Sequence, residues 1–86
     1  MESITKIAQT TYPMNIVIAH FNTHWVDNPG GVEKSTCQLA NALRERGHKV
    51  TILYRDGREG PPYFPLDESI PVDNILFENG KKVISD

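Results

Sequence analysis

The sequence contains little that could bind a metal, cross-link the chain or cross a membrane. Its single cysteine, Cys37, excludes an intrachain disulfide and a cysteine-built metal site, and it is typical of a reducing compartment. The longest apolar run, residues 16–19, is far shorter than a membrane span, and the start MESITKIAQTTYP lacks the apolar stretch of a signal peptide. We therefore expect a cytoplasmic chain that holds no metal and no tightly bound cofactor.

An excess of charge of one sign is also lacking. Nine lysines and arginines stand against eleven aspartates and glutamates, which gives a net charge of -2 and no broad positive surface for nucleic acid. The apolar fraction is 38% and the aromatic fraction 8%, so the hydrophobic core must be small. Together with the length of 86 residues, these values predict one domain at most, exclude a complete two-domain enzyme and argue against nucleic acid as a partner.

The chain divides into a short polar start and one domain. Residues 1–13 are polar apart from a few apolar residues at helical spacing, and Pro13 ends them, so we predict a leader or a weak helical turn. Residues 14–86 carry the pattern of a folded domain. It begins with MNIVIAH, a nearly continuous β-branched run that predicts a strand covered on both faces.

A helical pattern follows at residues 32–47. Its apolar residues recur at intervals of four, three and four, which predicts a core-facing stripe: Val32, Thr36, Leu39 and Leu43. Glu33 falls on the remaining, polar surface of this helix. Gly47 suits the residue of left-handed conformation that commonly ends a helix.

A second β-branched run, KVTILY at residues 49–54, completes a strand–helix–strand unit with short connections, which predicts parallel strands and a right-handed crossover. The run IPVDNILF at residues 70–77 predicts a third strand, which begins late or lies at an edge because Pro71 interrupts it. The residues NGKK at 79–82 predict a turn. The fold class is therefore α/β, with a Rossmann-like parallel sheet. One helix cannot cover both faces of three strands, so we expect a portion of a longer domain, or an oligomer that covers the bare face.

The stretch NPGGVE at residues 28–33 lies after a strand and at the start of a helix. The first turn of a helix carries amide N–H groups without partners and a partial positive charge, which attract an anion by roughly 0.3 to 1 kcal/mol. Gly30 and Gly31 have no side chains to keep a phosphate from these amides. Ligands of open α/β sheets bind beyond the carboxyl ends of the strands. The pattern predicts a phosphate site here, although Pro-Gly-Gly also suits a simple turn.

This stretch partly matches two known nucleotide-binding motifs. The dinucleotide fingerprint G-x-G-x-x-G fails, because the two glycines are adjacent and no third follows in the helix. GGVEKST resembles the GGVGKST of ParA- and MinD-like P-loop ATPases, but Glu33 stands where that loop needs glycine and sets a carboxylate against the triphosphate. A P-loop ATPase fragment and a phosphate-binding α/β module without catalysis are therefore alternatives.

The stretch MNIVIAHFNTHWVDNPGGVEKSTCQLANALRERGHKVTILY resembles the N-terminal strand–helix–strand unit of retaining glycosyltransferases with the GT-B fold, of the large glycosyltransferase family 4. The matching pieces are the short first strand, GGVE at residues 30–33, LANAL at 39–43 and GHKVT at 47–51. YFPLDESIPV is more loosely similar to the family's loop into the third strand. The resemblance covers about half of the chain well.

The resemblance implies a transferase that moves a sugar from a nucleotide diphosphate sugar to a carbohydrate or lipid-linked acceptor, in the synthesis of cell-surface polysaccharide or lipopolysaccharide. The nucleotide sugar is then a co-substrate, bound mainly by a C-terminal domain that also carries the paired glutamates of an E-x7-E motif. Neither is contained in this sequence, so the resemblance implies the incomplete first domain of a GT-B fold with no catalytic residue and no activity of its own. It also implies peripheral membrane association of the full protein.

The family's glycine-rich loop after the first strand faces the diphosphate of the donor, which implies this role for Gly30 and Gly31. The other loop residues would line the acceptor side of the cleft: Asn22, His24, Trp25 and Asp27. Trp25 would either stack on a sugar face or pack on its own domain. Asp27 would accept hydrogen bonds from sugar hydroxyls.

Overall fold

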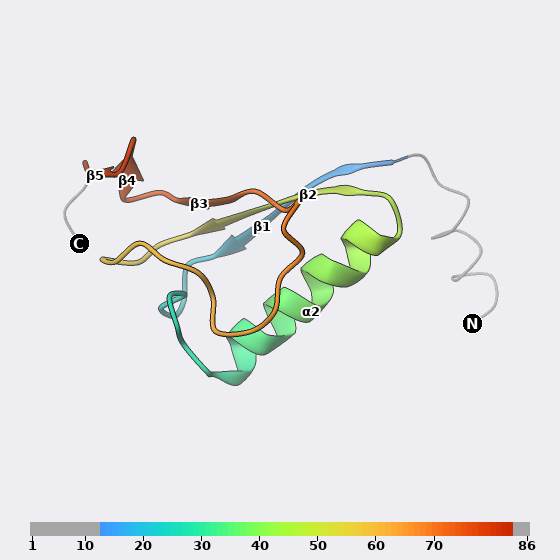
Figure 1. Ribbon diagram of the computed structural model, residues 1–86, viewed down its shortest axis with the longest axis horizontal. Coiled ribbons are helices and arrows are strands. Elements are labelled where there is room, and N and C mark those ends of the chain that lie inside the picture. Colours follow the sequence, from blue (N-terminus) through green and yellow to red (C-terminus); the bar gives the residue numbers. More distant parts are fainter. Residues whose placement is uncertain (1–12, 84–86) are drawn as a thin grey trace.

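The computed structural model describes residues 13–83 (Figure 1). The predicted leader therefore lies outside the described residues, except for Pro13. The elements, in chain order, are β1 (Asn15–His20), α2 (Gly31–Glu45), β2 (Lys49–Tyr54), β3 (Val72–Asn74), β4 (Phe77–Glu78) and β5 (Lys81–Lys82). Strands β1, β2 and β3 form one parallel sheet in that order, and β4 and β5 form a small antiparallel pair. The α/β class, the parallel strands and, within residues 13–83, the single helix are thus confirmed.

The third strand is shorter than the pattern predicted. Only Val72–Asn74 pairs with β2, directly after Pro71, and β3 lies at the edge of the sheet as expected. The chain then turns away into the β4–β5 hairpin, whose tip residues Asn79 and Gly80 have φ values of 53° and 77°. The turn at NGKK is therefore confirmed, whereas the two short strands that flank it were not expected.

The core lies between the sheet and the helix. Figure 1 shows α2 and the long loop before β3 on the same side of the sheet. The side chains of β2 that face them, Val50, Ile52 and Tyr54, are buried, as are Cys37 and Ala40 on α2. The opposite face is open among the described residues, and Val17 of β1 is 60% exposed on it. The prediction that β1 is covered on both faces was wrong for residues 13–83, because α2 supplies only one layer.

The helix is turned about its axis relative to the predicted stripe. Val32 and Leu39 are 54% and 52% exposed, whereas Glu33, placed on the polar surface by the sequence pattern, is only 1% exposed. The small residues Cys37 and Ala40 form the centre of the buried face, which lets the helix approach the sheet closely. Glu33 is buried with them because it has polar partners there.

Both ends of the helix connect closely to the sheet. At its carboxyl end, Gly47 has φ = 94°, its N–H bonds to the carbonyl of Arg44 at 3.0 Å, and the N–H of His48 bonds to the carbonyl of Leu43 at 3.2 Å. This confirms the predicted left-handed glycine at a helix end. The buried ring of His48 then accepts a hydrogen bond at 3.2 Å from the N–H of Met14, the residue before β1.

Gly47→Ala is expected to lower the free energy of unfolding by about 1 kcal/mol, because alanine is strained in the left-handed conformation. No atom lies within 4 Å of an added Cβ, so backbone strain and not a clash is responsible. Urea unfolding followed by far-ultraviolet circular dichroism measures the effect. Gly31→Ala, where an added Cβ also meets open space and φ is not positive, is the control and should change stability little. Equal stabilities of the two variants would contradict the strain argument.

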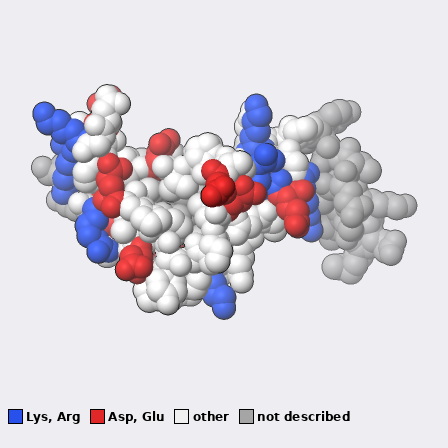
Figure 2. Space-filling view, viewed as in Figure 1, with Lys and Arg blue, Asp and Glu red and all other residues white. Residues whose placement is uncertain are grey.

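The charged side chains of the described residues are of both signs on the face shown in Figure 2. In Figure 2 acidic and basic side chains are interspersed over the visible face, as expected from the net charge of -2. Within residues 13–83, the helix has neither the length nor the apolar character needed to cross a membrane.

Candidate anion site at the carboxyl ends of the strands

The loop at residues 21–30 leaves the carboxyl end of β1 and leads into α2, so it lies at the edge where parallel α/β sheets bind ligands. Gly31 is the first residue of α2 and is exposed. An added Cβ at Gly31 would meet no atom within 4 Å. Gly31 also lies at one end of a shallow hollow of about 650 Å³ along the flank of α2, lined also by Val32, Ser35, Thr36 and Leu39. The Cα of Gly31 therefore faces open space at the start of the helix.

Gly30 is not equivalent to Gly31. Its N–H donates a hydrogen bond to Oδ1 of Asn28 at 3.0 Å, and its carbonyl accepts the N–H of Lys34 at 3.1 Å. A Cβ at Gly30 would collide with the carboxylate of Glu33. The amide predicted to bind a diphosphate at Gly30 is therefore already bonded within the chain, and of the glycine doublet Gly31 is the open position.

A buried polar cluster lies directly behind the glycine doublet. Oε2 of Glu33 is 2.9 Å from Nε2 of His20, at the end of β1, and accepts a hydrogen bond from the hydroxyl of Thr23. Nδ1 of His20 is 3.2 Å from Oγ1 of Thr36 on α2. Burial alone would raise the pKa of Glu33, but hydrogen bonds from Thr23, from its own backbone N–H and from His20 lower it below the usual value. Glu33 is thus a buried carboxylate at the start of the helix.

Asn22, His24 and Asp27, which the resemblance assigned to the acceptor side, are all exposed in this loop. Asp27 has φ = 51°, a left-handed conformation that aspartate tolerates better than most residues. The side chains of all three are open to solvent and available to a ligand. The structure brings them to the same loop as Gly31, at the same edge of the sheet.

Trp25 differs from these neighbours. It is 0% exposed, stacks on Tyr54 at a ring-centroid distance of 5.7 Å and meets the ring of His20 edge-on at 5.1 Å. The role of a platform for a sugar ring is therefore contradicted, and the alternative of packing on its own domain is confirmed. The physical reason is that the small core needs the largest apolar side chain of the loop to fill the space beside β1 and β2.

Asp56, just after β2, is a buried residue of this edge that the sequence pattern did not single out. Its Oδ2 accepts the N–H groups of Trp25 and Val26 at 3.2 and 2.9 Å, and its Oδ1 accepts that of Arg58 at 3.0 Å. Burial would raise its pKa, but these backbone hydrogen bonds lower it below the ordinary value. The side chain of Asn74 donates to the carbonyls of Asp56 and Arg58 at 2.8 and 3.0 Å. Through these hydrogen bonds, Asp56 and Asn74 connect the loops that follow the three strands.

The only sign of this network in the sequence is that Asp56 closely follows the predicted second strand, because Asn74 lies inside the predicted third strand. His24 and Arg58 lie near the same carboxylate, with Nδ1 and Nε at 3.7 and 3.9 Å from Oδ1 of Asp56. Both side chains are largely exposed, so these contacts add little to stability. Within residues 13–83 no group of three or more His, Cys, Asp and Glu side chains is arranged to hold a metal ion.

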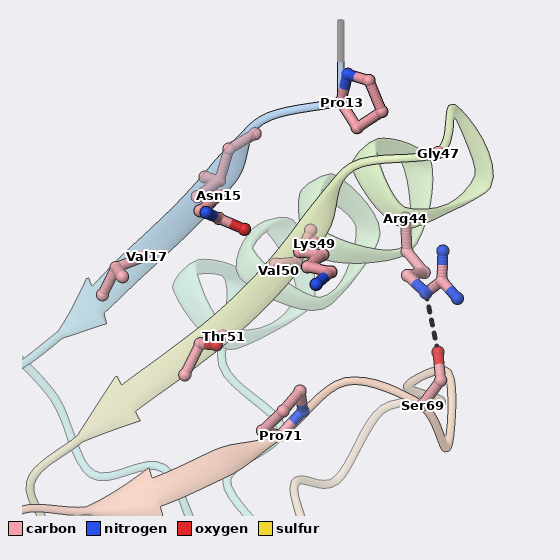
Figure 3. A pocket seen from close by; sticks show the side chains of 11 residues that line it. Pro13, Asn15, Val17, Arg44, Gly47, Lys49, Val50, Thr51, Ser69 and Pro71 are labelled. Carbon is pink, nitrogen blue, oxygen red and sulfur yellow. Dashed lines mark hydrogen bonds between the residues drawn. The ribbon is translucent and has the colours of Figure 1, made fainter.

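A second hollow, of about 630 Å³, lies on the open face of the sheet near the amino ends of the strands (Figure 3). Figure 3 shows Asn15 and Val17 of β1 beside Lys49 and Thr51 of β2, with Pro71 just before β3. This hollow is at the opposite end of the strands from the glycine doublet. We attribute it to the missing second layer of the sheet, because ligands of parallel sheets bind at the carboxyl ends.

No family model, no curated protein and no solved structure matches this chain. The likeness to GT-B glycosyltransferases therefore stays a prediction from the residues quoted above.

Proposed function

We propose that the chain is the N-terminal, acceptor-side part of a retaining GT-B glycosyltransferase, which moves a sugar from a nucleotide diphosphate sugar to a carbohydrate or lipid-linked acceptor. One observation carries the proposal: Gly31 opens α2 at the carboxyl edge of a parallel sheet, with open space in front of it. A diphosphate there would meet the Gly31 amide and the positive end of the helix dipole. The departing diphosphate gains charge in the transition state, so fixed N–H donors stabilise it more than the ground state.

The other residues of the loop have different roles in the proposed function. Asn22, His24 and Asp27 offer hydrogen-bonding groups to the acceptor, and the buried Trp25 fixes the loop that presents them. No catalytic residue is assigned to this chain, because the E-x7-E glutamates are expected on a separate C-terminal domain. We accordingly expect no sugar transfer by the 86 residues alone. The open sheet face would be covered by further polypeptide of the domain or by a second copy, and the full protein would act in the cytoplasm, at the membrane periphery.

No observation favours the ATPase alternative. A P-loop wraps around the phosphates before its helix begins, whereas Gly31 and Glu33 already belong to the first turn of α2. The carboxylate of Glu33 also lies against Gly30, in the space that the motif would give to phosphate. We therefore expect Lys34→Ala to leave nucleotide binding unchanged, with or without Mg²⁺.

Gly31→Val is expected to weaken binding of inorganic pyrophosphate and of UDP-glucose about fivefold or more, because the branched side chain blocks the approach to the amide. Isothermal titration at fixed pH measures both affinities. Val has room at Gly31, so stability should change by no more than about 0.5 kcal/mol. Ser35→Val, one turn further along the same hollow, is the matched control. Equal affinities for the wild type and Gly31→Val would refute the phosphate site, whereas pyrophosphate binding without any nucleotide-sugar preference would favour the module without catalysis.

A further inference from the structure

The two edges of the parallel sheet differ in how they are protected from another strand. Strand β3 is only 3 residues long, begins directly after Pro71 and carries the exposed carboxylate of Asp73. Short length, proline and charge are the usual means by which proteins keep an edge strand from pairing. Strand β1 is 6 residues long and contains no proline, lysine, arginine, aspartate or glutamate. Within residues 13–83 no strand lies beside its outer edge, which is therefore open to a further strand.

The backbone groups at this open edge belong to Asn15, Val17 and Ala19. The N–H of Lys49 on β2 bonds at 2.8 Å to the carbonyl of Met14, directly before β1. Because alternate residues of a parallel strand bond to the same neighbour, every second residue from Met14 onwards directs its N–H and C=O to β2. The N–H and C=O groups of Asn15, Val17 and Ala19 therefore point away from β2. They are spaced symmetrically about Val17.

The apolar stripe that the sequence pattern predicted for α2 lies on the same side of the molecule as this edge. Thr36, a member of the stripe, contacts the histidine that ends β1. Asn41 and Arg44, on the opposite flank of α2, bond to the long loop before β3. Leu39 and Leu43 follow Thr36 at intervals of three and four residues, so they continue the flank beside β1. Leu39 is more than half exposed there, so much of the stripe faces solvent instead of the core.

We propose that the outer edge of β1 and this flank of α2 form one interaction surface, which binds the same surface of a second copy of the chain across a two-fold axis at Val17. The two β1 strands pair antiparallel, so that Asn15 lies opposite Ala19 of the second copy and the two copies of Val17 lie opposite each other. This register joins all the open backbone groups of the edge in about six N–H···O=C bonds. The two sheets become one continuous sheet with both helices on the same face.

The same axis brings the two apolar stripes together. Helix α2 packs over β1 and β2, so it lies about one strand spacing, roughly 4.8 Å, from an axis just outside β1. The two copies of α2 would then lie about 10 Å apart, close to the usual distance between packed helices. Val17 precedes His20 by about 10 Å of strand, which corresponds to about seven residues of helix beyond Thr36. Leu39 and Leu43 therefore lie near the axis and contact their counterparts.

A second copy is the partner that this surface fits. The surface is self-complementary, because the axis sets Val17 against Val17 and the stripe of Leu39 and Leu43 against itself. None of these residues is charged, so no oppositely charged partner is required. One strand edge and one helix flank are a small contact, at the lower end of specific interfaces, which bury roughly 1,200 Å² in total, so we expect a weak dimer. Gly31 lies about 15 Å along α2 from the axis, outside the contact, and the inference does not depend on what binds there.

The test is sedimentation velocity on the 86-residue chain from roughly 10 μM to 1 mM, the range in which a weak dimer forms. Val17→Lys sets two ammonium groups against each other across the axis, and Leu39→Lys places a charge in the apolar stripe. Each should raise the dissociation constant about tenfold or more. The matched controls should leave it unchanged: Val83→Lys, a valine 53% exposed after β5, and Thr51→Lys, on the open face of β2 away from the edge.

Hydrogen exchange of single amides measures the register. The amides of Val17 and Ala19 should exchange about tenfold more slowly at the high concentration than at the low one. Those of Ile16 and Ile18, which bond to β2 within one chain, should change much less. In a mixture of labelled and unlabelled chains, the Hα protons of Ile16 and Ile18 from different copies should show a nuclear Overhauser effect, because this pair is the close, non-hydrogen-bonded one.

The outcomes decide the inference without reference to the anion site. A chain that stays monomeric at the highest concentration would overturn it, as would a dimer that survives both Val17→Lys and Leu39→Lys. A dimer lost in Thr51→Lys would place the contact on the open sheet face and overturn it as well. Loss of the dimer in the two edge variants alone, with concentration-dependent protection of the Val17 amide, supports it. Both substituted side chains are more than half exposed, and circular dichroism checks that the variants keep the fold.

Discussion

Trp25→Ala is expected to lower the free energy of unfolding by about 3 to 5 kcal/mol, the range for loss of a fully buried aromatic side chain. Trp25 is 0% exposed and joins the loop to the sheet through Tyr54 and His20. A domain of this size has a total stability of roughly 5 to 10 kcal/mol, so the variant should lose a third or more of it and unfold at a much lower urea concentration. The measurement is urea unfolding followed by circular dichroism.

The matched control for this prediction is Tyr63→Ala, an aromatic residue of the long loop that is 57% exposed. It should change stability by about 0.5 kcal/mol or less. Trp25→Phe should fall between the two variants, because it keeps part of the buried area. A Trp25→Ala chain as stable as Tyr63→Ala would mean that the loop does not depend on this residue, and its assigned role in fixing the loop would be lost.

The second large effect is expected at Asp56. Asp56→Ala should lower the free energy of unfolding by about 3 kcal/mol, because it leaves the buried N–H groups of Trp25 and Val26, and the partly buried N–H of Arg58, without an acceptor. Asp56→Asn keeps one acceptor oxygen and should lose about half as much. Asp73→Ala, an exposed carboxylate on β3, is the control with little effect. Equal stabilities of the Asp56 and Asp73 variants would contradict the role of Asp56.

The same carboxylate predicts how stability depends on pH. Burial raises the pKa of Asp56 in the folded chain, but hydrogen bonds from the backbone outweigh burial and lower this pKa below its ordinary value. A group with a lowered folded pKa contributes stability that is complete above the unfolded value of about 3.8 and is lost as the pH falls through the folded pKa. The wild type should therefore lose stability below about pH 4, and Asp56→Asn should show a smaller loss. Identical acid profiles would assign acid unfolding to other groups, such as Glu33, whose pKa is also lowered.

The strands and the helix were predictable because local residues define them. The runs NIVIA and KVTIL are rich in β-branched residues, and Gly47 marks the helix end by its conformation alone. The direction in which the helix faces was not predictable. Its buried face depends on Glu33 meeting His20, thirteen residues earlier in the chain, and periodicity treats a glutamate as exposed. The sequence cannot show that a distant histidine and threonine will satisfy this carboxylate.

The candidate site was predictable in place but not in detail. The position of the glycine doublet after a strand and before a helix brought the loop to the carboxyl edge of the sheet, as expected. That Asn28 occupies the amide of Gly30, and that Trp25 is buried rather than exposed, depends on the path of the loop. Asp56, which holds that path, acts across thirty residues of sequence separation. Such long-range contacts leave no periodic signal.

The exposed apolar residues bear on the prediction of further polypeptide. Val17 on the open sheet face and Val32 and Leu39 on the flank of α2 are each more than half exposed. Strand β1 also lies at an edge of the sheet. These features are typical of a parallel sheet that lacks its second layer, and they support the proposal of a longer domain or an oligomer. Light scattering on the 86-residue chain should find an oligomer if no further polypeptide is present.

The amide resonance of Gly31 gives the most direct measurement of the proposed diphosphate site. In a ¹⁵N-labelled chain titrated with UDP-glucose, we predict that this resonance moves in a saturable manner, while those of Gly47 and Gly80, in the turns after α2 and β4, stay in place. A Gly31 resonance that remains fixed while the ligand shifts amides elsewhere, or shifts none, would contradict a phosphate contact at the start of the helix.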